Sequence, residues 1–169
     1  MKTPTISVDL KTVLKKLKLG QIIATLPDRL VLAQKQGLSI DETMLLVLSD
    51  EVTRRDSTAC TRRADKAGLD PEMTMERWDV TAKVRYDKRV LAELMSLRFV
   101  EAGKNAVILG AVGVGKTFLA CALGHVATRH GYNVIFTRAD AMLRRLKQSR
   151  LDNSREAVIA ELVPRNRGR

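Results

Sequence analysis

The chain has 169 residues, 45% of them apolar and only 4% aromatic, so aliphatic side chains must build its core. No apolar run approaches the roughly 18 residues of a membrane span, and the start MKTPTISVDLK has no signal-peptide pattern. The net charge of +11 favours a polyanionic partner such as nucleic acid; a soluble protein from an arginine-rich lineage is the alternative. Cys60 and Cys121 lack metal-site spacing and indicate reduced thiols, so we expect a cytoplasmic protein without membrane contact.

Residues 1–69 predict an all-helical N-terminal domain. An apolar stripe at helical spacing begins at Leu10, and a second helix over residues 21–36 contains Pro27. Ser39 and Glu42 form a capping box that opens a longer helix. That helix passes through three apolar positions and ends at a glycine: Leu45, Leu48, Val52 and Gly68.

Residues 70–103 predict a connector and one helix. Trp78 lies in the connector, where an anchor packed on a neighbouring helix is favoured over a platform for stacking a base. Asp87 is placed to cap a helix that ends at Gly103.

Residues 104–169 change pattern and predict an α/β layer. The apolar runs 106–109 and 133–137 predict parallel strands, and residues 116–130 between them predict a helix. Asp140 is expected to cap a further helix, followed by an amphipathic stretch over residues 152–162 and a basic tail over residues 164–169.

Residues 110–117 read GAVGVGKT and match the phosphate-binding P-loop pattern G-x-x-x-x-G-K-[ST] at every fixed position. Gly110, Gly113 and Gly115 let the backbone curl so that its N–H groups point at phosphates. Lys116 supplies a cation for the β and γ phosphates, and the Thr117 hydroxyl is placed to ligate Mg²⁺. The helix that follows directs its positive end to the same point. The motif predicts binding of ATP, or a similar nucleotide, with Mg²⁺.

Hydrolysis of the nucleotide needs further catalytic groups outside the P-loop, and the sequence does not provide them. A carboxylate at the end of another apolar strand normally holds the metal, and a further group orients the attacking water. The acidic residues after the P-loop lie in helical patterns, so we assign no catalytic residue: Asp140, Asp152, Glu156 and Glu161.

Three basic residues form the candidate nucleic-acid contact. Arg55, Arg62 and Lys66 are spaced by seven and four residues, which places them on one face of a helix. A solvated helix face, balanced by Asp56 and Asp65, is an equally good interpretation of the same pattern.

Together these motifs resemble a known family. Residues Leu97–Gly103, the run Asn105–Leu109, the P-loop, Leu119–His125 and Arg138–Asp140 resemble the IstB-like ATP-binding proteins that assist insertion-sequence transposases. Those proteins are similar to the DnaC helicase loaders of the AAA+ ATPases. The resemblance covers the chain to about Val163 and is most specific over residues 99–140.

The resemblance implies an AAA+ type P-loop NTPase fold: an α/β core with parallel strands over residues 104–169, preceded by the helical N-terminal domain. It implies a homo-oligomer in the full-length family, with DNA and the transposase of the same element as partners. By position, it places the phosphates against Gly113, Val114, Gly115, Lys116, Thr117 and Phe118. The family's acidic strand and later catalytic elements do not follow, so the chain looks C-terminally truncated and defective in hydrolysis.

Two other functions fit the same residues. A replicative helicase loader would share the P-loop and the basic helical region. A non-catalytic nucleic-acid-binding protein would carry the P-loop as a remnant. A P-loop metabolite kinase fits less well, because the basic helical N-terminus has no role in such an enzyme.

Overall fold

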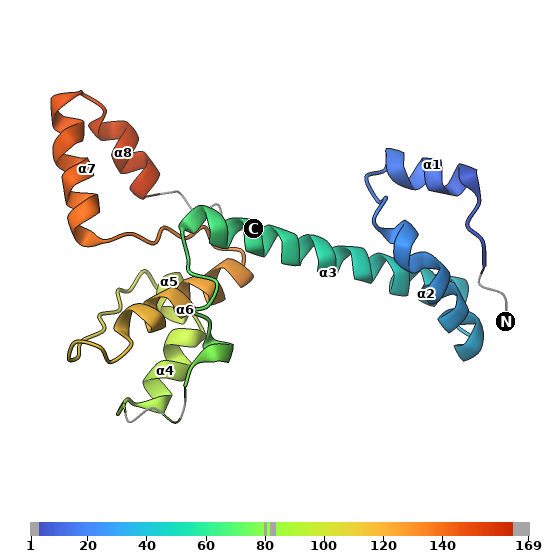
Figure 1. The fold of residues 1–169 in the computed structure, drawn as a ribbon, viewed down its shortest axis with the longest axis horizontal. Coiled ribbons are helices and arrows are strands. Elements are labelled where there is room, and N and C mark those ends of the chain that lie inside the picture. The colour runs from blue at the N-terminus through green and yellow to red at the C-terminus, as the bar shows by residue number, and fades with distance from the viewer. Residues whose placement is uncertain (1–3, 80, 82–83, 164–169) are drawn as a thin grey trace. The chain divides into compact units, whose positions relative to one another are not determined.

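The computed structural model describes residues 4–79, 81 and 84–163, and every regular element in these ranges is a helix (Figure 1). The elements are α1 (Val8–Lys16), α2 (Ile22–Gln36), α3 (Ile40–Ala67), the short 3₁₀ helix η1 (Met75–Arg77), α4 (Lys88–Met95), α5 (Arg98–Glu101), α6 (Lys116–Arg129), α7 (Ala139–Leu151) and α8 (Arg155–Leu162). The basic tail 164–169 lies outside the described residues, as do three residues of the connector.

The predicted α/β fold with parallel strands is wrong for the described residues. Residues 106–109 and 133–137 form no strand, and Val107 and Leu109 are 79% and 87% exposed. The N–H of Phe136 donates to the carbonyl oxygen of Ala67, at the end of α3, rather than to a neighbouring strand. Because a strand exists only in a hydrogen-bonded ladder, an apolar run without a paired strand stays irregular.

The chain divides into two compact units, Met1–Ala59 and Cys60–Arg169, and α3 passes from one into the other. The first unit is a small helical assembly whose buried core consists of Ile6, Ile22, Leu26 and Val47. Four partly buried aliphatic side chains pack around it: Leu14, Leu19, Ile23 and Leu30. Aliphatic residues therefore build this core, as the composition requires.

The beginning of α3 confirms the predicted capping box. The backbone N–H of Ser39 donates to Oε2 of Glu42 at 2.8 Å, and the N–H of Glu42 donates back to the Ser39 hydroxyl at 3.4 Å. These bonds satisfy two donors that a helix terminus leaves without intrahelical partners. Gly68, with φ of 71°, follows the last residue of α3, as predicted.

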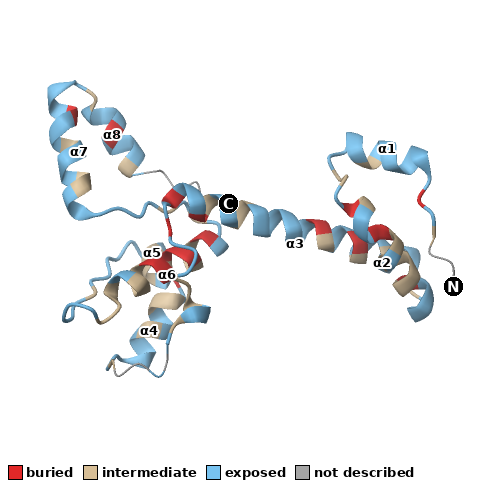
Figure 2. Ribbon diagram, in the orientation of Figure 1, coloured by how far each residue is buried: buried red, intermediate tan, exposed pale blue. Residues whose placement is uncertain are grey.

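The first unit buries only one side of α3 (Figure 2). Val47 and Glu51 are 8% and 4% exposed. In contrast, the three apolar residues that mark this helix in the sequence lie at the surface: Leu45, Leu48 and Val52 are 68%, 39% and 58% exposed. The helical periodicity is present, but these side chains do not supply the core.

The second unit contains two departures from the predicted helices. The helix predicted to run from Asp87 to Gly103 is broken at Leu97, whose φ of 57° separates α4 from α5. Asp87 caps α4 as predicted, because its carboxylate accepts from the N–H groups of Arg89 and Val90. Asp140 does not cap α7: that position belongs to Arg138, and Asp140 pairs with both Arg138 and Arg144.

A buried carboxylate in the first unit, that of Glu51, is paired with two arginines. Glu51 accepts from Nε and Nη2 of Arg54, both at 2.8 Å, and from Nε of Arg55 at 2.7 Å. The hydrogen bonds from Arg54 are the main reason that the pKa of Glu51 lies at about 2, below its ordinary 4.5. The ionised carboxylate is therefore stabilised in the folded chain.

We expect Glu51→Gln to flatten the acid dependence of stability. Below about pH 4.5 the unfolded chain binds this proton before the folded chain does, so the stabilisation is lost progressively as the pH falls through about 2. The melting temperature of the parent chain should fall more steeply between about pH 5 and pH 2 than that of the variant, by circular dichroism. Glu156→Gln, on the exposed surface of α8, is the matched control. Parallel profiles for the parent and Glu51→Gln would contradict the role of this carboxylate.

Candidate nucleotide-binding site

The P-loop lies directly before α6 and bends sharply at two glycines. Gly113 and Gly115 have φ of 83° and 86°, values that L-amino acids with side chains rarely adopt. Gly115 is the N-cap of α6, so the first N–H groups of this helix and its positive dipole end open onto the loop. The local geometry is that of an anion-binding turn.

Lys116 and Thr117 begin the helix beside this turn. The side chain of Lys116 folds back over the loop, and its ammonium donates to the carbonyl oxygen of Ala111 at 2.5 Å. Lys116 is half-buried and Thr117 is exposed. The Lys116 ammonium and the Thr117 hydroxyl therefore lie beside the turn at the beginning of α6.

Trp78 packs against the P-loop. A Cβ atom added to Gly115 would lie 3.7 Å from the indole ring, which is van der Waals contact. The indole also packs on the ring of Phe118, with centroids 5.5 Å apart, and meets Tyr86 edge-on at 5.9 Å. Its Nε1–H donates to the Tyr86 hydroxyl at 3.3 Å. Trp78 thus joins the connector to α6.

A cavity of about 500 Å³ extends from the loop along this aromatic group. It is lined by the loop residues Gly110, Ala111, Val114, Gly115 and Lys116, by Trp78 and Tyr86, and by the aliphatic face of α4. Its volume lies within the range of small-molecule and cofactor pockets, and its lining combines apolar walls with a few polar groups. The arrangement suits a ligand with an anionic end and a flat apolar end.

The helix α6 is held in place by close packing on the segment that follows α3. A Cβ atom added to Gly124 would lie 2.8 Å from Cδ2 of Leu69, closer than real Cβ contacts, so the absence of a side chain permits this approach. Ala64, Ala67, Leu69 and the fully buried Cys121 form the second core cluster. Burial raises the pKa of the Cys121 thiol, which keeps it protonated.

The polar groups where α6 meets α3 and the segment after it form hydrogen bonds with one another. The Arg63 guanidinium donates to the carbonyl oxygen of Thr128 at 2.7 Å, and Nε2 of His125 lies 2.8 Å from the carbonyl oxygen of Asp70. At the exposed C-terminal end of α6, Arg129 forms a bidentate ion pair with Glu76 in η1. The Arg129 hydrogen bonds hold the pKa of Glu76 at about 2. The connector that carries Trp78 is therefore attached to α6 at both ends of the helix.

Comparison with known proteins identifies the family. The sequence model described as "IstB-like ATP binding protein" matches residues 12–166. The chain belongs to this family. It is 36% identical to a Mycobacterium tuberculosis protein whose name describes an ATP-binding protein in an insertion sequence, over 86% of this chain and 58% of that protein. Identity to the ATP-binding protein of insertion sequence IS21 from Pseudomonas aeruginosa is 32% over 91% of this chain and 58% of the relative.

A third relative, the ATP-binding protein of IS1162 from Pseudomonas fluorescens, is 32% identical over 89% of this chain and 65% of its own length. This IstB-like chain thus spans 58 to 65% of the lengths of these three relatives. None of its described helices is long and apolar enough to cross a membrane.

Carboxylates are scarce around the loop of this IstB-like chain. Asp87 is the acidic residue among the described residues that line the cavity, and its oxygen is engaged by the two N–H groups at the start of α4. No group of three or more His, Cys, Asp or Glu among the described residues is arranged to hold a metal ion. Among the described residues, the cavity lining thus combines one lysine of the loop with a single carboxylate, that of Asp87.

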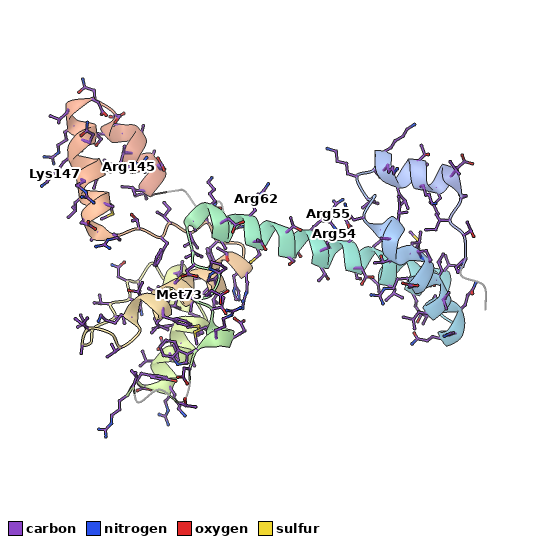
Figure 3. The ribbon with its side chains drawn as sticks, in the orientation of Figure 1. Arg54, Arg55, Arg62, Met73, Arg145 and Lys147 are labelled. Carbon is purple, nitrogen blue, oxygen red and sulfur yellow. The ribbon has the colours of Figure 1, made fainter. Side chains whose placement is uncertain are left out.

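The predicted nucleic-acid residues divide between the two units. Arg55 lies in the first unit, where it donates to Glu51 and, through Nη2, to the carbonyl oxygen of Lys18 at 2.7 Å. Arg62 and Lys66 lie in the second unit on the last turns of α3, where Arg62 is exposed. Figure 3 shows Arg55 and Arg62 on α3, and Arg145 and Lys147 on α7.

Sequence reasoning did not place Trp78 at the P-loop. The glycines, Lys116 and Thr117 are found from a contiguous motif, whereas Trp78 precedes Gly115 by 37 residues and reaches it only through the fold. The sequence offered one indication, the scarcity of large aromatic residues. The chain has one Trp and two Tyr, and Trp78 and Tyr86 both line this cavity.

We expect Gly124→Val to destabilise the second unit by about 1–3 kcal/mol, the usual cost of overpacking. The new side chain must displace Leu69, which lies against α6. Thermal unfolding followed by circular dichroism measures the effect, and adding Leu69→Ala should recover part of the loss by making room. If Gly124→Val alone left the melting temperature unchanged, the close approach of Leu69 would not constrain the fold.

Proposed function

We propose that this chain binds Mg-ATP at residues 110–117 and acts as an ATP-binding, DNA-associated helper in the transposition of an insertion sequence. The observation that supports nucleotide binding is that the P-loop and Trp78 line the same cavity. A phosphate-binding turn beside an apolar, aromatic-lined wall is complementary to the two ends of a nucleotide.

In this proposal the backbone N–H groups of the loop bind the phosphates, and Lys116 neutralises the β and γ charges. Thr117 provides a hydroxyl ligand for Mg²⁺. Phe118 contributes its backbone N–H, while its ring supports Trp78. The remaining phosphate contacts come from Gly110, Gly113, Val114 and Gly115.

The apolar part of the cavity accommodates the base. Trp78 and Tyr86 present ring surface, and Leu91 belongs to the α4 side of the same wall. Aromatic and aliphatic walls favour a flat heterocycle through dispersion and removal of apolar surface from water. The triphosphate then extends towards α6.

We propose that this chain binds the nucleotide without turning it over. In-line attack on the γ phosphate requires a group that orients water and a carboxylate that supports the metal. Asp87, the acidic residue among the described cavity residues, is already used to cap α4. Phosphate binding and phosphate cleavage are thus separable here.

We expect Lys116→Ala to weaken Mg-ATP binding strongly, because it removes the cation at the loop. The single Trp78 is the natural reporter, since its ring contacts Gly115, and its fluorescence should change when Mg-ATP is added to the parent chain. A charge-assisted contact is worth about 1.5–3 kcal/mol, so the variant should bind at least roughly tenfold more weakly. The measurement is a fluorescence titration.

Lys104→Ala, an exposed lysine outside the cavity lining, is the matched control and should bind like the parent. Phosphate release measured on the same samples should stay at background. Equal binding by Lys116→Ala and the parent would favour the alternative in which the P-loop is a remnant. Sustained phosphate release that depends on Lys116 would contradict binding without turnover.

For nucleic acid, we propose that Arg55, Arg62 and Lys66 bind DNA phosphates. The exposure of Arg62 near the end of α3 supports this assignment. The net charge of +11 supports a polyanionic partner, and binding through phosphates is independent of base sequence.

We expect the triple variant Arg55→Gln, Arg62→Glu, Lys66→Glu to weaken DNA binding and flatten its salt dependence. For every phosphate that the variant no longer neutralises, the slope of log K against log salt should become shallower by about 0.9. Fluorescence anisotropy with a labelled duplex at several salt concentrations measures both effects. Lys147→Glu with Arg150→Glu, on α7, is the control pair. A weakening confined to the control pair would move the interface to α7.

The insertion-sequence context favours the transposase of the same element as protein partner. The three relatives described above carry names that place them in insertion sequences, and none of these names refers to replication. We therefore prefer a transposition helper to a replicative helicase loader.

A further inference from the structure

The indole of Trp78 contacts α6 at the beginning of the helix. It lies 3.7 Å from the position of a Cβ atom on Gly115, packs on the ring of Phe118, and donates its Nε1–H to the Tyr86 hydroxyl. The side chain is nevertheless only half-buried. A half-buried ring can turn into solvent unless the backbone that carries it is also held. The placement of Trp78 therefore depends on what fixes the 3₁₀ helix η1 directly before it.

The short helix η1 contains little that fixes it from within. None of its three residues is buried, and its N-cap makes no side-chain hydrogen bond to the helix. The segment before it is attached to α6 where Leu69 packs on Gly124. A second attachment is the carbonyl oxygen of Asp70, which lies 2.8 Å from Nε2 of His125. Both attachments precede Trp78 by eight residues or more, so they do not determine where its ring lies.

A bidentate ion pair attaches η1 itself to α6. Both Nη atoms of Arg129 donate to the carboxylate of Glu76, with 3.1 Å between Nη2 and Oε2. The two side chains are 47% and 58% exposed, and ion pairs this open to water add little to folding stability. A bidentate pair does fix the orientation of the guanidinium relative to the carboxylate. Its effect is therefore on the position of η1 rather than on the stability of the fold.

The ion pair and the indole contact opposite ends of α6. This helix has 14 residues and is about 21 Å long, from Gly115 at its N-cap to Arg129. Glu76 and Trp78 are two residues apart, so their Cα atoms are separated by at most about 7 Å. The side chains of Arg129, Glu76 and Trp78 cover the remaining length. A shift of the Trp78 ring along the helix would therefore strain the ion pair.

We infer that Glu76 and Arg129 are positioning residues of the nucleotide site, whose ion pair holds the Trp78 ring at the P-loop, ready to contact the base. The inference rests on the nucleotide binding proposed above and adds two residues that are not among the described residues of the cavity lining. In this arrangement neither residue contacts the phosphates. Loss of the pair should therefore weaken binding of the base and leave binding of the phosphates unchanged, whereas loss of a merely structural contact would affect both.

Isothermal titration calorimetry of the full chain with Mg-ATP, and with inorganic triphosphate and Mg²⁺, tests this difference. Glu76→Ala should bind Mg-ATP about threefold to tenfold more weakly than the parent, because the ring must then be ordered when the base binds. Its affinity for inorganic triphosphate, which has no base, should match that of the parent. Unchanged Mg-ATP affinity of Glu76→Ala, or an equal loss for both ligands, would overturn the inference.

Glu161→Ala is the matched control. It breaks the bidentate pair between Arg145 of α7 and Glu161 of α8, whose side chains are 48% and 61% exposed, much like those of the pair on η1. This variant should bind both ligands like the parent, because it removes an ion pair of the same kind at a place that does not hold Trp78.

Acrylamide quenching of the single Trp78 tests the placement of the ring without any nucleotide. Glu76→Ala should be quenched more strongly than the parent and should emit at longer wavelength, because its indole is more open to water. Glu161→Ala should match the parent. Equal quenching of Glu76→Ala and the parent would overturn the inference. If the parent bound neither Mg-ATP nor triphosphate, the proposed function would fail, whereas quenching would still decide whether the pair holds the ring.

Charge exchange separates the ion pair from other effects of each substitution. Glu76→Arg alone places two guanidinium groups opposite each other and should increase the quenching beyond that of Glu76→Ala. Adding Arg129→Glu restores opposite charges and should reverse most of this increase, although a carboxylate is less favourable at the C-terminal end of α6. A double variant that is quenched as strongly as Glu76→Arg would contradict the role of the pair.

Discussion

The close contact between Gly124 and Leu69 packs α6, which begins at the P-loop, against the segment after α3. A Cβ atom at position 124 would lie 2.8 Å from Cδ2 of Leu69, so a side chain there would require Leu69 or the helix to shift. With glycine there, α6 lies close enough for the carbonyl oxygen of Thr128 to accept from Arg63, and for Nε2 of His125 to lie 2.8 Å from the carbonyl oxygen of Asp70. Among the described residues, no buried side-chain N or O atom lacks a hydrogen-bond partner. Close packing and polar pairing thus occur together where α6 meets the segment after α3.

The position of α6 in turn fixes the aromatic group. Arg129, at the end of the helix, holds Glu76, and two residues later Trp78 lies against Gly115 at the beginning of the same helix. A chain with few aromatic side chains thus places two of them, Trp78 and Phe118, in contact with each other beside the glycine-rich turn of the P-loop motif. Rigid rings with few rotatable bonds lose little entropy on ordering, so they make a wall that is already formed before a ligand arrives.

Signals that depend on neighbours in sequence predicted much of this structure. The capping box at Ser39, the cap at Asp87 and the glycine after α3 each involve residues within four positions, and all three are present. The predicted strands failed because a strand needs a partner elsewhere in the chain, and an apolar run such as 106–109 cannot reveal whether one is available. For the site, the motif located the loop, but the position of Trp78 depends on packing across the fold.

The same difference between local and distant requirements separates phosphate binding from phosphate cleavage. A turn of eight consecutive residues and the first turn of one helix contain the backbone donors, the cation and the hydroxyl that an anion needs. Cleavage additionally needs a carboxylate held near the metal by a separate element, and the carboxylate of Asp87 is committed to the end of α4. That cap uses Oδ1 of Asp87, which accepts from the N–H groups of Arg89 and Val90 and holds the beginning of α4 beside the cavity. Cleavage thus places a requirement on distant parts of the chain, whereas an anion can be held by residues that are neighbours in sequence.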